Sequence, residues 1–368
     1  MFKKTASLIL VLSMAISMGA CGKKEEEVTV ESTPVVESAD PVEVPVEEEE
    51  TGSGVYSYLT GEEFSQDDAD DYGNLRPLAI MIPNDNYGAL PQYGLSKAGV
   101  IYEVPVEAPY TRLMAVFDRA ELSKLESVGP VRSCRLYYCY FDLEYDGIYT
   151  HFGESEYATS FLSSGQIDEI DGMTDESAFW RDSSRSRPDN AFTSSELLES
   201  MISSKGFRNE YSDDYEGHFK FADKDSEVTL NDGDTAETVK IGYQLSAPWF
   251  EYNQDDGLYY RYEYNSEHTD AATGEQLTCK NILIQSVSYY MEASHGTYHI
   301  NTTDGQEGYY ITNGKAIHVT WSKASESDRT IFYDDAGNEI TLNPGKTWIS
   351  IVLNDKFSDV SIGGGSSE

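Results

Sequence analysis

The sequence predicts an α+β protein with two folded domains: a mixed α/β N-terminal domain over residues 73–225 and a mostly antiparallel, β-rich C-terminal domain over residues 226–357. In the first domain, apolar runs typical of buried strands alternate with segments of helical pattern, which indicates a mixed sheet. In the second, segments rich in Tyr, Val, Ile and Thr are separated by Asp-Gly and Asn-Gly pairs, which favour hairpin turns. The Gly- and Ser-rich end predicts a flexible tail over residues 358–368.

The N-terminal domain is predicted to alternate strands and helices. Its strands are predicted from apolar runs at residues 77–83, 99–107, 111–118 and 147–153. Its helices are predicted from capping residues and helical spacing at residues 131–145, 154–162 and 194–205. Gly129-Pro130 opens the first helix, because proline is tolerated in the first turn.

The C-terminal domain is predicted to consist of strands joined by tight turns. Its clearest strands are predicted at residues 257–264, 281–287, 308–312, 315–321 and 347–352. Asp256-Gly257 and Asn313-Gly314 are the turn pairs that precede two of them.

The first residues predict export and lipid attachment. A charged start is followed by a short apolar run over residues 6–18, which is too short to span a bilayer and is typical of a signal peptide. Met18-Gly19-Ala20-Cys21 resembles a bacterial lipobox, in which the cysteine takes the lipid. We therefore expect a signal peptide over residues 1–20, lipidation at Cys21 and a place on the extracytoplasmic face of the membrane. The alternative is an ordinary signal peptide followed by a chance cysteine.

The charge of the chain limits its partners. The formal net charge is −39, and residues 25–71 contain 17 acidic residues and no Lys or Arg. Residues 21–72 are therefore predicted to be a lipidated, disordered acidic tether. Such a chain has no surface for neutralising phosphates, so nucleic acid is excluded as a partner, and a lipid anchor is the expected means of membrane attachment.

The cysteines predict neither a disulfide framework nor a metal site. Once Cys21 is assigned to the lipid, the odd remainder Cys134, Cys139 and Cys279 favours buried free thiols. No cysteine or histidine pair has zinc spacing, so no metal and no cofactor is predicted.

A set of charged residues in the N-terminal domain is the candidate ligand-binding site. Glu103 and Glu107 are four residues apart on one predicted strand, so we expect them to face the same side. The other members lie on neighbouring predicted elements and are Arg112, Arg132, Ser133, Arg135 and His151. The serine and the last two arginines fall in the first turn of the predicted helix at 131–145, where an anion is favoured. Arginine binds carboxylate or phosphate with two parallel hydrogen bonds.

Three interpretations of this set remain open at the level of sequence. It can bind an anionic ligand, it can be a purely structural network of ion pairs, or it can supply an acid and a base. For glycoside hydrolysis, Glu103 and Glu107 would be about 13 Å apart on a flat strand, which exceeds the usual separation of catalytic carboxylates. No nucleophile motif accompanies His151.

Several stretches together resemble a known family. They include Arg76-Pro77-Leu78-Ala79-Ile80-Met81-Ile82-Pro83-Asn84, Gly129-Pro130-Val131-Arg132-Ser133-Cys134-Arg135 and Pro344-Gly345-Lys346-Thr347-Trp348. These resemble the YerB-like lipoproteins of Gram-positive bacteria, over about residues 75–353. The resemblance implies a two-domain envelope lipoprotein of unknown function and no assigned reaction. Arg187-Pro188-Asp189-Asn190 departs from the Pro-His-Asn typical of the family.

The sequence therefore favours a lipid-anchored protein that binds an anionic cell-wall component or an envelope protein without catalysis. A cell-wall glycan hydrolase or transferase is the first alternative, and a structural scaffold with a fully paired charge cluster is the second.

Overall fold

The computed structural model describes residues 52–364 of the chain. The predictions for the signal peptide, for Cys21, and for the tether up to residue 51 lie outside the described residues. Within them, strands and helices alternate in the N-terminal part and strands predominate in the C-terminal part, which confirms the predicted α+β class. In the described part of the chain, no helix is both long and apolar enough to span a bilayer.

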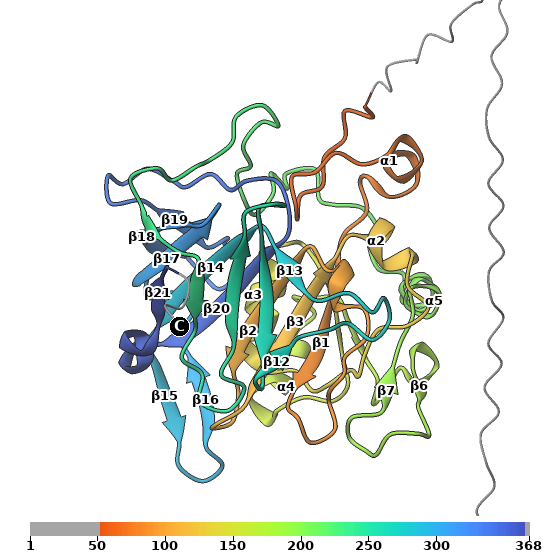
Figure 1. Cartoon of the computed structure of the whole chain (residues 1–368). Helices are drawn as coiled ribbons and strands as arrows, with labels where there is room; N and C mark the ends of the chain where they lie inside the picture. Colours follow the sequence, from red (N-terminus) through yellow and green to blue (C-terminus); the bar gives the residue numbers. More distant parts are fainter. Residues whose placement is uncertain (1–51, 365–368) are drawn as a thin grey trace, which may run out of the picture. The chain divides into compact units, whose positions relative to one another are not determined.

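The largest sheet among the described residues is mixed and has 11 strands (Figure 1). In spatial order its strands are β19 (Ile331–Tyr333), β18 (Lys315–Ser322), β17 (Glu307–Thr312), β14 (Asn281–Val287), β20 (Thr347–Leu353), β2 (Val100–Pro105), β3 (Thr111–Phe117), β1 (Leu78–Asn84), β4 (Ile148–His151) and β5 (Glu169–Asp171). β8 (Asp234–Thr235) also pairs with β18. The predicted strands are confirmed, most with ends shifted by one to three residues.

The pairing of β2 with β20 joins the two parts of the chain. These strands run parallel, with Val100 opposite Thr347 and Glu103 opposite Ser350. One sheet therefore contains strands from both predicted domains. β14 is parallel to β20, and β1, β4 and β5 are parallel to one another, whereas β3 is antiparallel to β1 and β2. The carboxyl ends of β20, β2, β1, β4 and β5 consequently lie along the same edge of the sheet.

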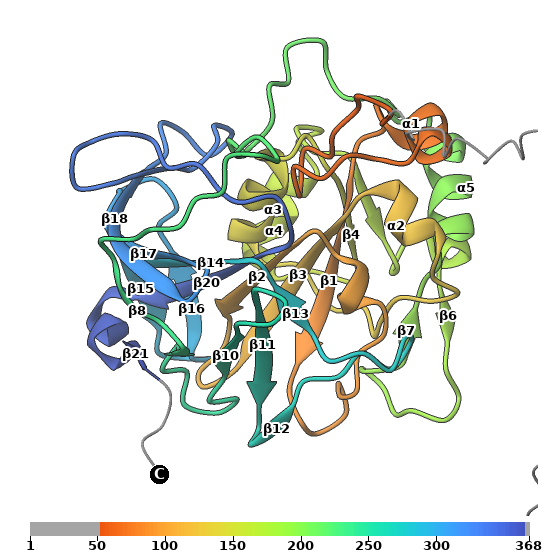
Figure 2. The ribbon, with the colours of Figure 1, turned by 45° about the horizontal axis from the view of Figure 1, so that its top comes forward.

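Both faces of the sheet are covered. Along β1, Leu78, Ile80 and Ile82 belong to one apolar core, and Ala79 and Met81 belong to the other, as expected from the alternation of side chains along a strand. The helices are α1 (Gln66–Tyr72), α2 (Arg119–Ser123), α3 (Leu136–Leu143), α4 (Glu156–Leu162) and α5 (Ser195–Lys205), with short 3₁₀ turns at Leu95–Lys97, Glu176–Ala178 and Asn354–Asp359. Figure 2 shows α3 and α4 behind the sheet and the strands of a second sheet in front of it.

The second sheet, together with α2 and α5, packs against the apolar core that contains Leu78, Ile80 and Ile82. Its strands, in order, are β12 (Ser266–Glu267), β11 (Leu258–Glu263), β10 (Trp249–Asn253), β9 (Thr238–Lys240) and β21 (Ser361–Gly363), with β13 (Thr278–Cys279) paired to β11. Two further hairpins are β15 (Tyr289–Glu292) with β16 (Thr297–Ile300) and β6 (Trp180–Arg181) with β7 (Ala191–Phe192). In Figure 1 these hairpins lie at lower left and lower right.

The prediction of a disordered tether is wrong for residues 52–72. This segment forms α1, whose N-cap Ser65 accepts a hydrogen bond from the backbone N–H of Asp68. Leu59 is fully buried, and the Ser57 hydroxyl donates to the Asp118 carboxylate over 2.6 Å. Composition alone misses this packing, because a few well-placed side chains are enough to fix a predominantly acidic segment.

The predicted helix at 131–145 begins at Leu136 rather than Val131. The preceding backbone is extended and its N–H groups bond to other segments: Val131 to the carbonyl of Ala191 (2.7 Å) and Arg132 to that of Met81 (2.9 Å). These contacts compete with the i to i−4 bonds of a helix. Residues 132 and 133 therefore lie outside the helix, and Arg135 is its N-cap residue.

Candidate functional site

The candidate site lies at the sheet edge where the parallel strands end. Open α/β sheets place ligands in the crevice outside the carboxyl ends of their strands. At this edge β1 ends at Asn84, β4 at His151 and β5 at Asp171, while β3 begins at Thr111. Of the residues predicted from the sequence, Glu107 lies in the turn between β2 and β3, Arg112 lies near the start of β3, and Arg132, Ser133 and Arg135 lie in the segment before α3.

Arg112 and Arg135 converge on Glu107. Arg135 binds the Glu107 carboxylate through Nε and Nη2, at 2.7 and 2.5 Å. An Arg112 Nη2 lies 3.9 Å from the same carboxylate, while its Nη1 donates to the Ser133 carbonyl over 2.6 Å. Burial, together with the positive charge of Arg135, lowers the pKa of Arg112 to about 10. The single negative charge of Glu107 thus faces two positively charged guanidinium groups, so a second anion bound nearby would stabilise both.

Arg132 occupies the next position along the edge. Its Nε lies 3.2 Å from the Asp189 carboxylate, but neither of these two atoms has a well-aligned hydrogen bond among the described residues. The side chain is 22% exposed and borders two cavities. Asp189 is buried, and its burial raises the pKa of its carboxyl group. The Arg132 guanidinium is therefore held at the surface with hydrogen-bonding capacity to spare.

Three adjoining cavities form what we term the edge groove. The first, the Arg112 pocket, has a volume of about 350 Å³ and is lined by Pro83, Asn84, Asp85, Tyr87, Val106, Glu107, Tyr110, Thr111, Arg112, Arg132, Pro188 and Asp189. The second, the Ser133 pocket, measures about 570 Å³ and shares Arg132 and Pro188 with the first. The third, the Trp180 pocket, measures about 380 Å³ and shares Phe152, Met173, Arg181 and Arg187 with the second.

Glu103 does not belong to this groove. Its side chain is fully buried and accepts hydrogen bonds from Arg261 (2.8 Å), Thr111 (2.9 Å) and Asn84 (3.1 Å). β2 ends at Pro105, so Glu103 and Glu107 do not face the same side of one strand as predicted. Arg261 comes from β11, and its guanidinium also contacts Glu263 at 3.1 Å. Sequence reasoning missed Arg261, because it is distant in the chain and carries no motif.

His151 is buried directly behind the edge groove. Its Nε2 lies 3.0 Å from a Glu169 oxygen and its Nδ1 lies 2.9 Å from the Gly153 carbonyl. Burial by itself lowers the pKa of His151, but the Glu169 hydrogen bond and the electrostatic interactions with Cys134 and Asp171 raise it to about 9. Both ring nitrogens face acceptors, so the imidazolium form is favoured.

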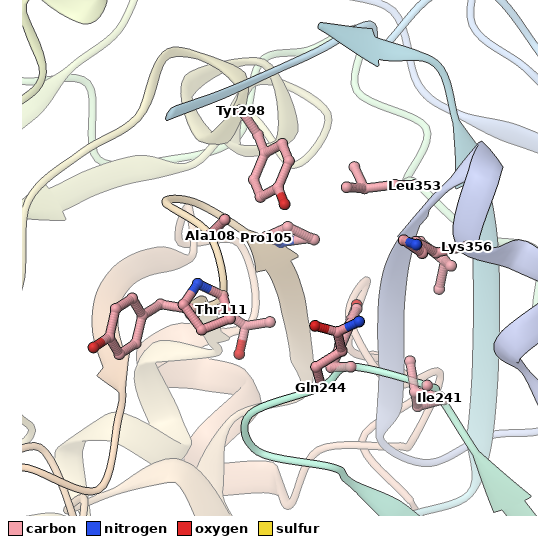
Figure 3. Close-up of a pocket in the computed structure, with 13 residues that line it drawn as sticks. Pro105, Ala108, Thr111, Ile241, Gln244, Tyr298, Leu353 and Lys356 are labelled. Atoms are coloured by element: carbon pink, nitrogen blue, oxygen red, sulfur yellow. The ribbon is translucent and has the colours of Figure 1, made fainter. Parts of the chain in front are cut away.

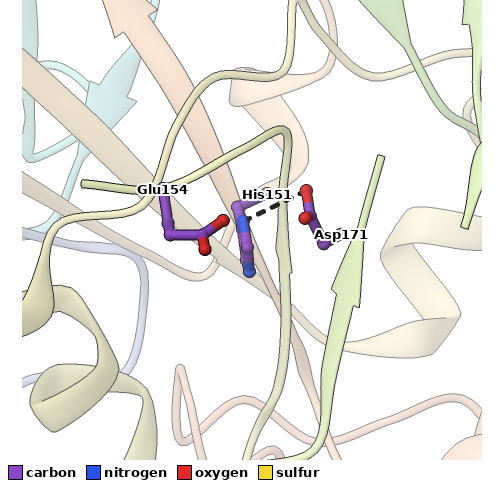
Figure 4. Close-up of side chains that lie close together, drawn as sticks. All are labelled: His151, Glu154 and Asp171. Atoms are coloured by element: carbon purple, nitrogen blue, oxygen red, sulfur yellow. Dashed lines mark ion pairs between the residues drawn. The ribbon is translucent and has the colours of Figure 1, made fainter. Parts of the chain in front are cut away.

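The residues around His151 also shape the wall of the edge groove. Glu154 and Asp171 lie on either side of the ring (Figure 4), and one ligand atom from each of the three side chains fits within 4.8 Å. While the imidazole is protonated, it has no lone pair for a cation. Asp171 instead accepts from the backbone N–H groups of Gly153 (2.7 Å) and Met173 (3.0 Å), which both line the Ser133 pocket.

The three described cysteines are buried and free, as predicted. Cys134 precedes α3 and Cys139 lies within it, so their sulfur atoms come within 3.4 Å despite the five-residue spacing. Their burial makes them part of the core behind the groove rather than groups presented to a ligand.

A smaller, largely apolar cavity adjoins the edge groove at the ends of β2 and β20 (Figure 3). It measures about 110 Å³ and shares Tyr110 and Thr111 with the Arg112 pocket. Tyr298, Gln244 and Lys356 surround its opening.

Two family models match the chain. Residues 59–208 match "Protein of unknown function (DUF3048) N-terminal domain" and residues 239–349 match the corresponding C-terminal domain. The chain belongs to the DUF3048 family. It is 30% identical over 301 residues to "Putative lipoprotein YerB" of Bacillus subtilis (strain 168), an alignment that covers 79% of this chain and 85% of that protein. The resemblance identified from sequence motifs is therefore confirmed.

The family fold is also present in a solved structure. The crystal structure of the YerB protein from Bacillus subtilis superimposes with a TM-score of 0.72 and 28% sequence identity, and covers 84% of this chain and 99% of that one. DUF3048 proteins carry no assigned activity in their family description. Any function must therefore be argued from the edge groove itself.

Proposed function

We propose that this protein is a lipid-anchored envelope protein whose edge groove binds an anionic envelope component without catalysis. The observation that carries the proposal is the placement of Arg112 and Arg132 in an open groove at the carboxyl ends of the parallel strands. Arginine at such a position favours carboxylate or phosphate, because its planar fork donates two parallel hydrogen bonds.

The burial and pairing of the ionisable groups support binding rather than catalysis. Glu103 and His151 are fully buried and hydrogen-bonded, so neither reaches a bond in the groove. Glu107 does line the groove, but it is paired with Arg135. A catalytic acid and base must converge on one reacting atom, and these three residues do not.

The name of the Bacillus subtilis relative supports the lipid anchor proposed at Cys21. The test is metabolic labelling of the full-length protein with a radioactive fatty acid. We expect the label to be present in the wild-type chain and absent from Cys21→Ser. Equal labelling of the two would refute the anchor at this position.

Anion binding is tested by calorimetric titration of the full-length protein with galacturonate and with inorganic phosphate. Arg132→Gln should weaken binding of the better anion about 10-fold or more, since a hydrogen bond to a charged group contributes about 1.5–3 kcal/mol. Arg132→Gln combined with Asp189→Asn removes both charges of the pair and keeps the groove neutral if the single variant fails to fold.

The matched control is Arg208→Gln. Arg208 pairs with Asp146 near the start of β4, at the opposite edge of the sheet, so its loss should leave anion binding unchanged. If the Arg132 variants bind as tightly as the wild type, or if the wild type binds neither anion, the proposed site is wrong.

A further inference from the structure

The Trp180 pocket was not foreseen from the sequence. It is formed mainly by the segment that follows β5 and includes the β6–β7 hairpin. It adjoins the Ser133 pocket, and the two pockets share Phe152, Met173, Arg181 and Arg187. The groove therefore continues beyond the arginines of the proposed anion site.

The floor of the Trp180 pocket is aromatic. The Phe152 and Phe179 rings meet edge to face with centroids 5.4 Å apart, and the Arg181 guanidinium lies 4.1 Å from the Phe152 centroid. Trp180 stacks on Phe192 and remains 38% exposed. The exposed aromatic surface of Trp180, beside the half-buried Phe152 and Phe179, is suited to the apolar face of a ring.

The cations of this pocket lack the carboxylates that the other groove arginines possess. Arg181 donates to the Asn190 side-chain carbonyl over 2.8 Å, and within residues 52–364 neither Arg181 nor Arg187 has a carboxylate within ion-pair distance. Burial and the neighbouring charge of Arg187 both lower the pKa of Arg181. Glu176 is the one acidic residue among those that line this pocket, and it is exposed. Within the described residues these two guanidinium groups therefore lack a paired carboxylate, in a chain of net charge −39.

The pocket is held in place from behind. Asp171 fixes the turn at Met173 by accepting from its backbone N–H, and Arg181 is tied to Asn190 across the β6–β7 hairpin. Preorganised groups bind with a smaller loss of conformational entropy, so an ordered aromatic and cationic surface is a better binding platform than a mobile one.

We propose that the Trp180 pocket is a second subsite, which takes a sugar ring that carries an acidic group, so that the edge groove binds an extended anionic glycan. The inference rests on the proposed function and specifies its ligand: one acidic group at Arg132, and a further acidic ring between Trp180 and Arg187. The aromatic floor decides for a glycan over a ringless chain of phosphates, because a ringless chain leaves these aromatic faces without a partner.

The test compares galacturonate with tetragalacturonate as calorimetric titrants of the full-length protein. The wild type should bind the tetramer at least about 10-fold more tightly than the monomer, because the second subsite engages within the same molecule. Trp180→Ala and Arg187→Gln should each lose most of this gain, while binding of inorganic phosphate, which has no ring, is unchanged at Arg132. Both side chains are exposed, so the variants should fold.

The possible results separate this inference from the proposed function. If the wild type binds the monomer but gains nothing from the tetramer, or if both variants keep the full gain, the second subsite is refuted and the anion site stands. If inorganic polyphosphate binds as tightly as the tetramer and Trp180→Ala has no effect on it, the ligand is a ringless polyanion and the glycan is refuted. If the wild type binds no anion, the proposed function fails first. Arg208→Gln is again the control.

Discussion

The charge on His151 predicts a pH-dependent contribution to stability that can be measured directly. Its pKa is raised from 6.5 to about 9 in the folded protein by Glu169 and neighbouring negative groups, which outweigh the effect of burial. A raised pKa means that the folded state binds the proton more tightly than the unfolded state. The resulting stabilisation is complete below pH 6.5 and is lost as the pH rises through 9.

The magnitude follows from the shift. At about 1.4 kcal/mol for each pKa unit, the protonated imidazole contributes ~3 kcal/mol to the free energy of unfolding. Replacing His151 with Gln should therefore cost ~3 kcal/mol more at about pH 6 than at about pH 9.5. The comparison between the two pH values removes the packing cost of the substitution, which is common to both.

The assay is urea unfolding of the wild type and the variant at both pH values. His218→Gln is the matched control, because His218 is also buried but its pKa is lowered to about 4, chiefly by burial, so it is neutral at both pH values. Its substitution should cost about 1 kcal/mol less at about pH 6 than at about pH 9.5, because at the lower pH only the unfolded chain binds the proton, and this is the opposite direction to His151. A His151→Gln cost that does not change with pH would refute the protonated imidazole.

Three further outcomes are expected. A chain that begins at residue 73 loses the buried Leu59. Its free energy of unfolding in urea should therefore be lower, by about 2–5 kcal/mol or more, than that of a chain that begins at residue 51. Burial raises the pKa of Asp118 to about 7, so the charged carboxylate destabilises the fold at about pH 8. Asp118→Asn should therefore raise the free energy of unfolding by up to ~4 kcal/mol at about pH 8, seen as a higher melting temperature, and not at about pH 4. Lys323→Ala should cost about 3–5 kcal/mol in urea unfolding, because it leaves the fully buried Glu144 without its 2.6 Å partner, whereas the exposed Lys356→Ala should cost almost nothing.

The strands could be predicted because each carries its own signal. β14 and β20 are buried on both faces and are rich in Ile, Leu and Val, so their places are evident without knowledge of their partners. Their order in the sheet could not be predicted, because parallel pairs such as β2 and β20 join segments far apart in the chain without a local sequence signature.

The candidate site was predictable as a set of residues but not as a geometry. Arg112, Arg132 and Glu107 do meet in one pocket, since Glu107 and Arg112 flank the turn between β2 and β3 and the segment that carries Arg132 bonds to β1. The sequence also assigns Glu103 to that pocket, which is wrong. Its actual partner, Arg261, lies 158 residues later, and no local pattern reveals the pairing. The Trp180 pocket was missed because the two-residue strands β6 and β7 are too short to give a periodic signal.

The position of β20 determines when the molecule can be completed during synthesis. β20 is central in the sheet, between β14 and β2, yet at residues 347–353 it is the last of this sheet's described strands in chain order. Until those residues emerge, β2 and β14 each present an unpaired apolar edge, which is a template for association with other chains. A nascent or prematurely terminated chain that lacks β20 is thus prone to aggregate, so the synthesis of residues 347–353 decides whether the earlier strands β2 and β14 become paired.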